Sequence, residues 1–367
     1  MRILVLCADY PNLDGGISLN YVHTRNVSYY VNWGVDVTVI NFKTKQSYIK
    51  DGIKVISLKD FENTDNKIFD ILVCHASNIR NHYVFLKKYD RLFPKIVFFF
   101  HGHEVMKLTE DYPKEYSFKN GKNLKKIILP IYDNIKFKIW KRYIISQISR
   151  IHLIFVSEWM YDIFIKNLKI DGTILKNNMS IIYNSVSKNY ETLKYDISAK
   201  KTYDYITIRS YIDTSKYAID LVNKFAFANP DKKFLVVGKG EFFNHFEKAD
   251  NIEHIEQYMD QNQIIGLLNK SKCALMPTRC DSQGVMACEM ATFGIPLVTS
   301  DIDVCRLVLK DFPNVGFINN QSDGSDLQMI TRGLMPCVEH TKKRFFESQT
   351  IGKEMNLFKY LMTLVSR

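Results

Sequence analysis

Long apolar runs are missing from the sequence, which argues against a membrane-spanning helix. No apolar stretch approaches the roughly 20 residues needed to cross a bilayer, and Ile96–Phe100 and Ile127–Tyr132 are among the longest. The first apolar stretch, Ile3–Cys7, is too short for a secretory signal. We therefore expect a cytoplasmic protein.

Cysteine, glycine and proline patterns that mark other protein classes are also lacking. The seven cysteines include no CxxC pair, which favours reduced thiols over disulfides. No GxGxxG loop follows the first predicted strand, and no Walker A loop is present. With 16 Gly, 9 Pro and 46% hydrophobic residues among 367, the chain is a folded globular protein with room for two domains.

Acidic residues are scarce in the first half of the chain only. Residues 1–190 contain 28 Lys and Arg against 17 Asp and Glu, whereas residues 191–367 contain 22 of each, so the first half holds the whole net charge of +11. Such an excess favours an anionic partner, which can be nucleic acid, anionic lipid or a phosphorylated substrate. A merely solvated lysine-rich surface is the alternative.

Short apolar runs of the buried parallel-strand type recur along the chain, with helical or polar stretches between most of them. This alternation predicts two α/β domains, each with a doubly wound parallel sheet. The polar stretch 184–202 separates them, so we expect domains at 1–185 and 198–345, followed by an amphipathic helix within 346–367. The predicted strands are Ile3–Cys7, Val35–Phe42, Ile53–Leu58, Ile71–His75, Ile96–His101, Ile151–Val156, Ser180–Tyr183, Tyr205–Arg209, Lys233–Val237, Ile252–Ile255, Cys273–Met276 and Pro296–Thr299.

The segment Pro277–Asp301 is the most informative part of the sequence. It is typical of a strand, a glycine loop, a helix, a turn and a second strand, with Asp281 in the loop and Glu289 within the helix. Gly284 at the start of the helix leaves backbone N–H groups open to phosphate oxygens. An ordinary helix with an aspartate cap and an exposed glutamate is the alternative.

This acidic pair, followed by Ala291, Gly294 and Pro296, resembles the fingerprint of retaining glycosyltransferases of the GT-B fold, family four, also called group 1. The resemblance covers essentially the whole chain and implies two Rossmann-like domains facing across a cleft, with the C-terminal helix packing back toward the N-domain. Two departures are that aspartate replaces the first glutamate of the pair and that Lys216 is not followed by glycine. Further motifs occur in the family's order: Gly15-Gly16, His101-Gly102-His103-Glu104, Val156-Ser157-Glu158, Ile182-Tyr183-Asn184, Arg209 with Lys216, and Gly238-Lys239-Gly240.

The resemblance implies roles for individual residues. Arg209 and Lys216 would bind the diphosphate of a nucleotide-sugar, Glu289 the ribose hydroxyls and Asp281 the transferred sugar. On the acceptor side the candidates are His101, His103 and Glu104; His101 is the favoured catalytic histidine, and a purely structural imidazole is the alternative. The implied catalytic residues are Asp281, Glu289, His101, Arg209 and Lys216, and the implied donor-binding residues are Gly15, Gly16, Arg209, Lys216, Gly238, Gln283, Gly284, Val285 and Glu289.

A basic amphipathic helix is predicted at Ile131–Gln147, with Pro130 breaking or beginning it. Basic residues beside Phe137 and Trp140 fit attachment to an anionic membrane. A core-packed helix with a solvated lysine face is the alternative. The predicted membrane residues are Lys125, Lys126, Lys136, Lys138, Trp140, Lys141 and Arg142.

The resemblance implies a retaining, metal-independent transfer of a sugar from a UDP- or GDP-linked donor to a saccharide acceptor. With the basic helix, it suggests a lipid-linked acceptor, bacterial capsule, O-antigen or exopolysaccharide assembly, and a peripheral location at the inner face of the cell membrane. No cofactor or bound metal is expected, because Asp301 and Asp303 follow a strand after the glycine-proline turn and do not form a metal motif there. The alternatives are a nucleotide-sugar 2-epimerase and a basic nucleic-acid-binding protein; since no nucleic-acid-binding module is recognisable, we expect no nucleic-acid partner.

Overall fold

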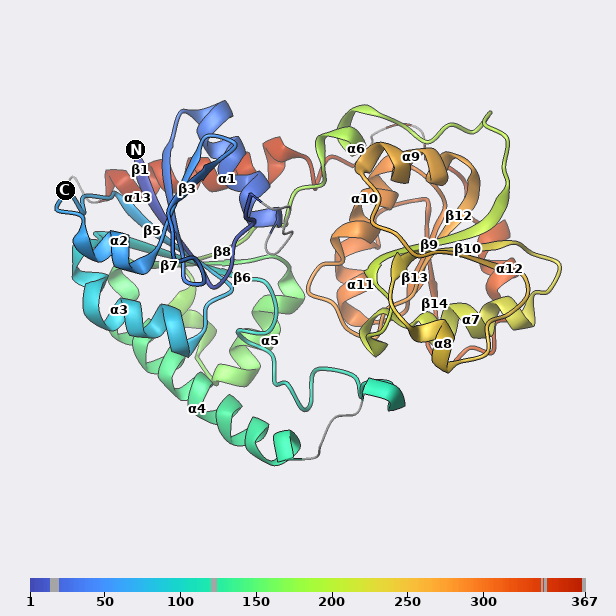
Figure 1. The fold of residues 1–367 in the computed structure, drawn as a ribbon, viewed down its shortest axis with the longest axis horizontal. Coiled ribbons are helices and arrows are strands. Elements are labelled where there is room, and N and C mark those ends of the chain that lie inside the picture. The colour runs from blue at the N-terminus through green and yellow to red at the C-terminus, as the bar shows by residue number, and fades with distance from the viewer. Residues whose placement is uncertain (14–19, 120–123, 338, 340–341, 365–367) are drawn as a thin grey trace. The chain divides into compact units, whose positions relative to one another are not determined.

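The chain forms two compact units in the computed structural model, which describes residues 1–13, 20–119, 124–337, 339 and 342–364, with the backbone alone for 124–128. The first unit contains Met1–Lys107, Pro130–Asn184 and Glu347–Arg367 (Figure 1). The second contains Leu108–Leu129 and Ser185–Phe346. Residues 108–129 thus group with the second unit, although they lie within the N-terminal half of the sequence.

The sheet of the first unit has eight strands in the order β3-β4-β2-β1-β5-β6-β7-β8. All neighbouring pairs are parallel except β3 with β4. The short strand β3 is an edge strand that the sequence analysis missed. The strands are β1 (Arg2–Cys7), β2 (Asp36–Asn41), β3 (Tyr48–Lys50), β4 (Ile53–Ile56), β5 (Ile71–His75), β6 (Lys95–Phe100), β7 (Ile151–Phe155) and β8 (Met179–Ile181).

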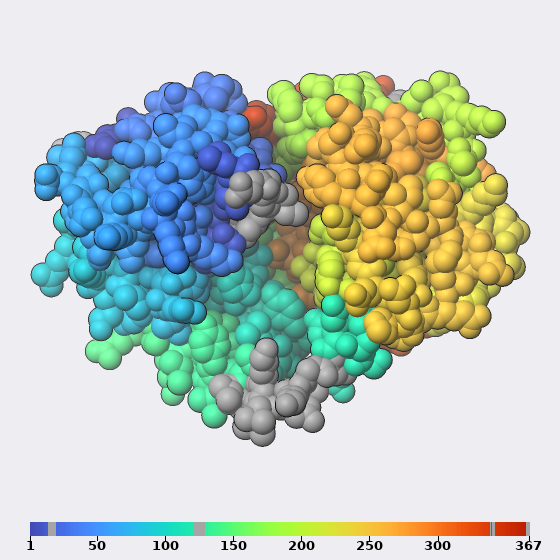
Figure 2. Space-filling view, in the orientation of Figure 1, coloured from blue at the N-terminus to red at the C-terminus, as the bar shows by residue number. Residues whose placement is uncertain are grey.

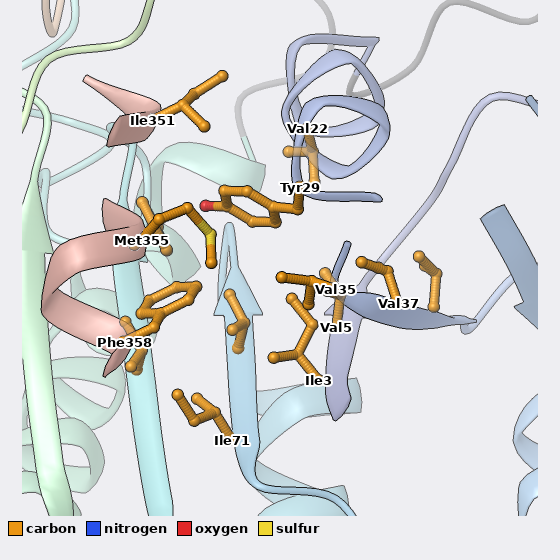
Figure 3. Close-up of a cluster of buried hydrophobic side chains, with 14 of the residues drawn as sticks. Ile3, Val5, Val22, Tyr29, Val35, Val37, Ile71, Ile351, Met355 and Phe358 are labelled. Atoms are coloured by element: carbon orange, nitrogen blue, oxygen red, sulfur yellow. The ribbon is translucent and has the colours of Figure 1, made fainter. Parts of the chain in front are cut away.

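Both faces of this sheet are covered, as the alternating side chains of β6 show. Val97 and Phe99 belong to the core beneath α1 (Asn20–Trp33) and α13 (Ile351–Thr363). Phe98 and Phe100 contact aromatic residues of α4 (Leu124–Ser146) and α5 (Glu158–Leu168). Figure 3 shows Met355 and Phe358 of α13 among Tyr29, Val5 and Ile71. The expected return of the C-terminal helix to the N-terminal domain is confirmed. The other helices of this unit are α2 (Leu58–Asn63) and α3 (Val84–Tyr89). Helix α4 belongs to this unit from Pro130 onward, and its first residues belong to the second unit.

The second unit has a wholly parallel six-stranded sheet in the order β11-β10-β9-β12-β13-β14. The α/β class with two parallel-sheet domains is confirmed; strand β14 was missed. The strands are β9 (Tyr203–Tyr211), β10 (Phe234–Lys239), β11 (Ile252–Ile255), β12 (Ser271–Met276), β13 (Leu297–Ser300) and β14 (Val315–Ile318), and the helices are α6 (Lys188–Thr192), α7 (Ile219–Ala228), α8 (Phe242–His245), α9 (Gln261–Asn269), α10 (Val285–Phe293), α11 (Asp303–Leu309) and α12 (Leu327–Arg332).

Helix α4 corrects the prediction that Pro130 breaks or begins the helix, because Pro130 lies inside it. Pro130 is solvent-exposed, and a proline inside a helix removes one backbone hydrogen bond without necessarily ending the helix. Among the described helices, none combines the length and the apolar character that a bilayer span requires.

Candidate active site

A pocket of about 270 Å³ lies at the carboxyl ends of β9 and β12 in the second unit. These strands are parallel neighbours, so the segments that follow them meet at one edge of the sheet, the usual place for a ligand in such folds. The pocket brings together five of the predicted residues, since it is lined by Arg209, Lys216, Asp281, Gly284 and Val285, together with Ile208, Ser210, Tyr217 and Met286.

Arg209 is a buried cation in this pocket. Its side chain donates one hydrogen bond, from Nη2 to the carbonyl of Pro277 at 2.7 Å, and its guanidinium lies 4.7 Å from the ring centroid of Tyr217. Its Nε is buried without a hydrogen-bond partner among the described residues. Burial lowers the pKa of Arg209, and Asp281 partly offsets this effect. The pocket therefore contains a cation with an unused donor.

Lys216 supplies a second cation, carried on the tight turn Ser215–Tyr217. Its Nζ lies 3.8 Å from Oδ1 of Asp281, and the two side chains are 27% and 14% exposed. Burial lowers the pKa of Lys216, but Asp281 and Tyr217 outweigh burial and leave it above its ordinary value. Lys216 is thus charged beside a carboxylate.

The amino end of α10 faces this pocket through Gly284 and Val285. Gly284 has a left-handed φ of +74°, which glycine adopts without a steric penalty, and no side chain caps the nine-residue helix. The backbone N–H groups of the first turn therefore keep the partial positive charge of a helix start.

Glu289 lies deeper, within α10, and does not line the pocket. It is 5% exposed, and its Oε1 accepts a hydrogen bond from the backbone N–H of Ser187 at 3.2 Å. Burial raises the pKa of Glu289 to about 7. Ser187 was not predicted as a site residue, because a backbone donor leaves no trace in the sequence.

Two other predicted donor residues are involved in packing. Gln283 is 3% exposed and its amide contacts the Cys288 sulfur. A Cβ on Gly238 would lie 2.3 Å from the carbonyl oxygen of Arg209, so this glycine allows β9 and β10 to approach closely beside the pocket. Gly15 and Gly16 lie outside the described residues.

The predicted acceptor-side residues form a compact loop at the end of β6 in the first unit. The buried carboxylate of Glu104 accepts hydrogen bonds from the backbone N–H of His101 at 3.0 Å and of Gly102 at 2.7 Å. The His103 side chain is 53% exposed. Glu104 therefore shapes the loop that carries both histidines.

His101 has a partner that the sequence analysis missed. Its Nε2 lies 3.0 Å from Nδ1 of the fully buried His75, and the two rings are stacked. Burial lowers the pKa of both histidines well below the ordinary value, so both are neutral at pH 7. The position of His75 as the last residue of β5 was the available signal, because β5 and β6 are neighbours.

The predicted membrane helix needs a correction. Trp140 and Phe137 are 3% and 5% exposed and contribute to the core. Lys136 is also buried; it pairs with Asp133 at 2.8 Å and donates to the carbonyls of His103 and Met106. None of the three can reach a lipid surface, because packing on β6 turns this face of α4 inward.

The other predicted membrane residues differ in exposure. Lys138 and Arg142 are exposed and Lys141 is half-buried, with its ammonium donating to the carbonyl of Lys169. Lys125 and Lys126 lie in α4, but their side chains are outside the described ones.

The Asp301 and Asp303 pair has other roles. The Asp301 carboxylate accepts hydrogen bonds from the guanidinium of Arg306, and Asp303 begins α11. No cluster of three metal-ligating side chains occurs within the part of the chain that the structure describes.

Residues 197–329 match the family described as glycosyl transferases group 1. An uncharacterized 41.2 kDa protein in the cps region of Klebsiella pneumoniae is 22% identical over 207 residues. That match covers 52% of this chain, and the chain spans little more than half, 57%, of the relative.

Three solved structures share the fold across almost the whole chain. Sucrose-phosphate synthase from Thermosynechococcus elongatus has a TM-score of 0.69 at 10% identity, covering 99% of both chains. Anabaena HepE in complex with UDP and glucose has a TM-score of 0.65 at 12% identity. The lipopolysaccharide outer core galactosyltransferase WaaB has a TM-score of 0.60 at 12% identity. Each of these two matches covers 98% of this chain and 99% of the other. Residues 197–329 therefore match the group 1 glycosyltransferases, and the chain as a whole shares the two-domain GT-B fold of these structures.

Proposed function

We propose that the protein is a retaining glycosyltransferase that moves a sugar from a nucleoside-diphosphate sugar to a saccharide acceptor. One observation carries the proposal: Arg209, Lys216 and the uncapped amino end of α10 line the same pocket. Two cations and a helix start form a fixed positive field where a diphosphate would accumulate charge as it leaves.

In the proposed reaction, the bond between the anomeric carbon and the diphosphate oxygen breaks. The nucleoside diphosphate leaves with the electron pair, an acceptor hydroxyl oxygen bonds to the anomeric carbon, and its proton is released. The Nε–H of Arg209 and the ammonium of Lys216 would stabilise the leaving diphosphate, so we propose that no divalent metal is needed. Asp281 would accept a hydrogen bond from a sugar hydroxyl, and Glu289 from the ribose.

Measurements of nucleotide binding and of turnover would test the proposal. UDP, GDP, ADP and dTDP are titrated by calorimetry, and a panel of nucleotide-sugars is screened for released diphosphate. At least one nucleoside diphosphate should bind, and K216A should weaken it at least tenfold, while K310A, which changes an exposed lysine of the same unit, should not. A chain that binds duplex DNA and none of the nucleotides would contradict the proposal and favour the nucleic-acid alternative.

We also propose that the acceptor is lipid-linked, in assembly of a bacterial capsule or a similar polysaccharide, and that α4 contacts the anionic membrane. Ile131 and Ile135 are 59% and 50% exposed, and the exposed Lys138 and Arg142 continue the same stripe at helical spacing. Apolar side chains beside two cations suit a shallow contact with anionic lipid.

Sedimentation with vesicles tests the membrane contact. The wild type should sediment with vesicles containing phosphatidylglycerol and not with phosphatidylcholine alone, and salt should release it. K138Q/R142Q should weaken binding, whereas K54Q/K59Q, which removes two exposed charges elsewhere in the first unit, should change it little. If both double variants lost vesicle binding equally, binding would depend only on the net charge of the protein, which would contradict the role of this stripe.

A further inference from the structure

The segment Leu108–Leu129 lies in the first half of the sequence but contributes to the core of the second unit. Tyr116 is 8% exposed within that core, and its ring centroid lies 5.0 Å from that of Phe242 and 5.8 Å from that of Phe246. Phe118 stacks on His245 with the centroids 4.2 Å apart. Figure 2 shows this segment, in teal, against the surface of the second unit. These aromatic contacts anchor the segment firmly.

The hydroxyl of Tyr116 connects this anchor to the Lys216 turn. It donates to Oδ1 of Asp220 at 2.7 Å, and Asp220 accepts two hydrogen bonds from the guanidinium of Arg279 at 2.7 and 2.6 Å. The same guanidinium donates from Nη1 to the carbonyl of Ser215 at 3.0 Å. The backbone N–H of Arg279 donates to the carbonyl of Lys216 at 2.8 Å. Arg279 therefore holds two consecutive carbonyls of the turn, and Tyr116 and Asp220 hold Arg279.

The backbone of this turn needs such support. Ala218 has a left-handed φ of +51°, a conformation that costs a residue with a Cβ roughly 1 kcal/mol, and its N–H closes the turn on the carbonyl of Ser215 at 3.1 Å. A strained turn persists only when its surroundings fix it. The backbone of the turn sets the starting point of the Lys216 side chain, whose Nζ lies 3.8 Å from Asp281.

We propose that Tyr116 is a positioning residue of the donor site, which fixes the Lys216 turn through Asp220 and Arg279. The donor site is then built from two distant parts of the chain, and the segment around Tyr116 is a functional piece of the donor domain. This inference rests on the proposed function of the pocket, since it assigns Lys216 to the donor diphosphate.

The variant Y116F removes the hydroxyl and keeps the packed ring. It should raise the Kd of the tightest-binding nucleoside diphosphate in the panel above roughly three- to tenfold, and the Ala218 amide should exchange its hydrogen faster in the ligand-free protein. In a K216A background, Y116F should change the Kd by less than twofold, because its effect acts through Lys216. Y143F is a matched control: Tyr143 is also 8% exposed, donates to Asp90 at 3.0 Å, and Asp90 pairs with Arg150, all in the first unit. Y143F should leave nucleotide affinity unchanged.

The outcomes separate this inference from the proposed function. If the wild type binds a nucleoside diphosphate and Y116F binds it equally well, the positioning role is overturned and the proposed function stands. An equal loss in the wild-type and K216A backgrounds would show a general structural effect and would also overturn the role. A wild type that binds none of the four nucleotides would overturn the proposed function, and this inference with it.

Discussion

Glu289 should make the second unit less stable as the pH rises. Burial raises its folded-state pKa to about 7 from an ordinary value of 4.5, so between these values the native state binds more protons than the unfolded state. The free energy of unfolding therefore falls as pH increases through this window, and the loss is complete above pH 7. A shift of this size corresponds to about 3 kcal/mol.

The variant E289Q replaces the buried carboxylate with a neutral amide of the same shape. At pH 8 it should be more stable than the wild type by roughly 2–3 kcal/mol, and at pH 5, where folded Glu289 is protonated, the difference should fall below about 1 kcal/mol. If Glu289 binds the ribose as proposed, donor affinity should fall roughly tenfold at pH 8, because an amide is a weaker acceptor than a carboxylate. A gain in stability joined to a loss in binding is typical of a residue retained for function.

Calorimetric unfolding at pH 5 and pH 8 measures the effect. All three tryptophans, Trp33, Trp140 and Trp159, lie in the first unit, so tryptophan fluorescence follows that unit as an internal reference. E256Q, which neutralises an exposed carboxylate of the second unit, should give no pH-dependent gain. The reasoning is refuted if E289Q is equally stable relative to the wild type at both pH values, or less stable at pH 8.

Four other substitutions test the site and the fold. R209A or K216A should lower turnover at least ~100-fold with little change in unfolding temperature, because in the proposed reaction the lost contacts would stabilise charge in the transition state. Near-normal turnover with the true donor would show that these residues do not bind the diphosphate. A218G should raise the stability of the second unit by roughly 0.5–1 kcal/mol, because glycine adopts the left-handed φ of Ala218 without strain. A lower free energy of unfolding for A218G in chemical denaturation would show that Ala218 is not strained. E354A should destabilise the first unit by about 3–5 kcal/mol, because it leaves the buried Arg25 without the carboxylate that lies 2.9 Å from its Nε; a loss below 1 kcal/mol would mean that solvent replaces the pair.

The sheets were predictable because their strands are short apolar runs buried on both faces. Ile71–His75 and Ile252–Ile255 agree with the structure to the residue. The edge strand Tyr48–Lys50 was missed because it has only three residues and is partly exposed. Strand Val315–Ile318 was missed because Gly316 interrupts its apolar pattern, in a place where a Cβ would lie 2.8 Å from Ile330.

The basic helix shows where sequence patterns stop being informative. A helix with lysines and aromatic residues on several sides has no unique core face, and Trp140 fits either lipid or a sheet. The structure buries Lys136 because Asp133 and two carbonyls of the His103 loop satisfy its ammonium. Those carbonyls are some 30 residues away in the sequence, so local periodicity could not identify them.

The buried charged groups of the two units differ in whether they are paired with an opposite charge. In the first unit, Arg25 is paired with Glu354, and Lys136 with Asp133, so each buried cation has its own carboxylate. In the second unit, Arg209 bonds only a carbonyl and Glu289 only a backbone N–H, among the residues that the structure describes.

The two groups are both on or beside the segments that form the pocket, and each has hydrogen-bonding capacity that the described residues leave unused. Burying such groups costs free energy unless a partner arrives. A nucleoside diphosphate offers both partners, anionic oxygens for the guanidinium and hydroxyl donors for the carboxylate. Under the proposed function, the folding cost of Arg209 and Glu289 would be recovered as binding energy when a ligand of this chemistry binds.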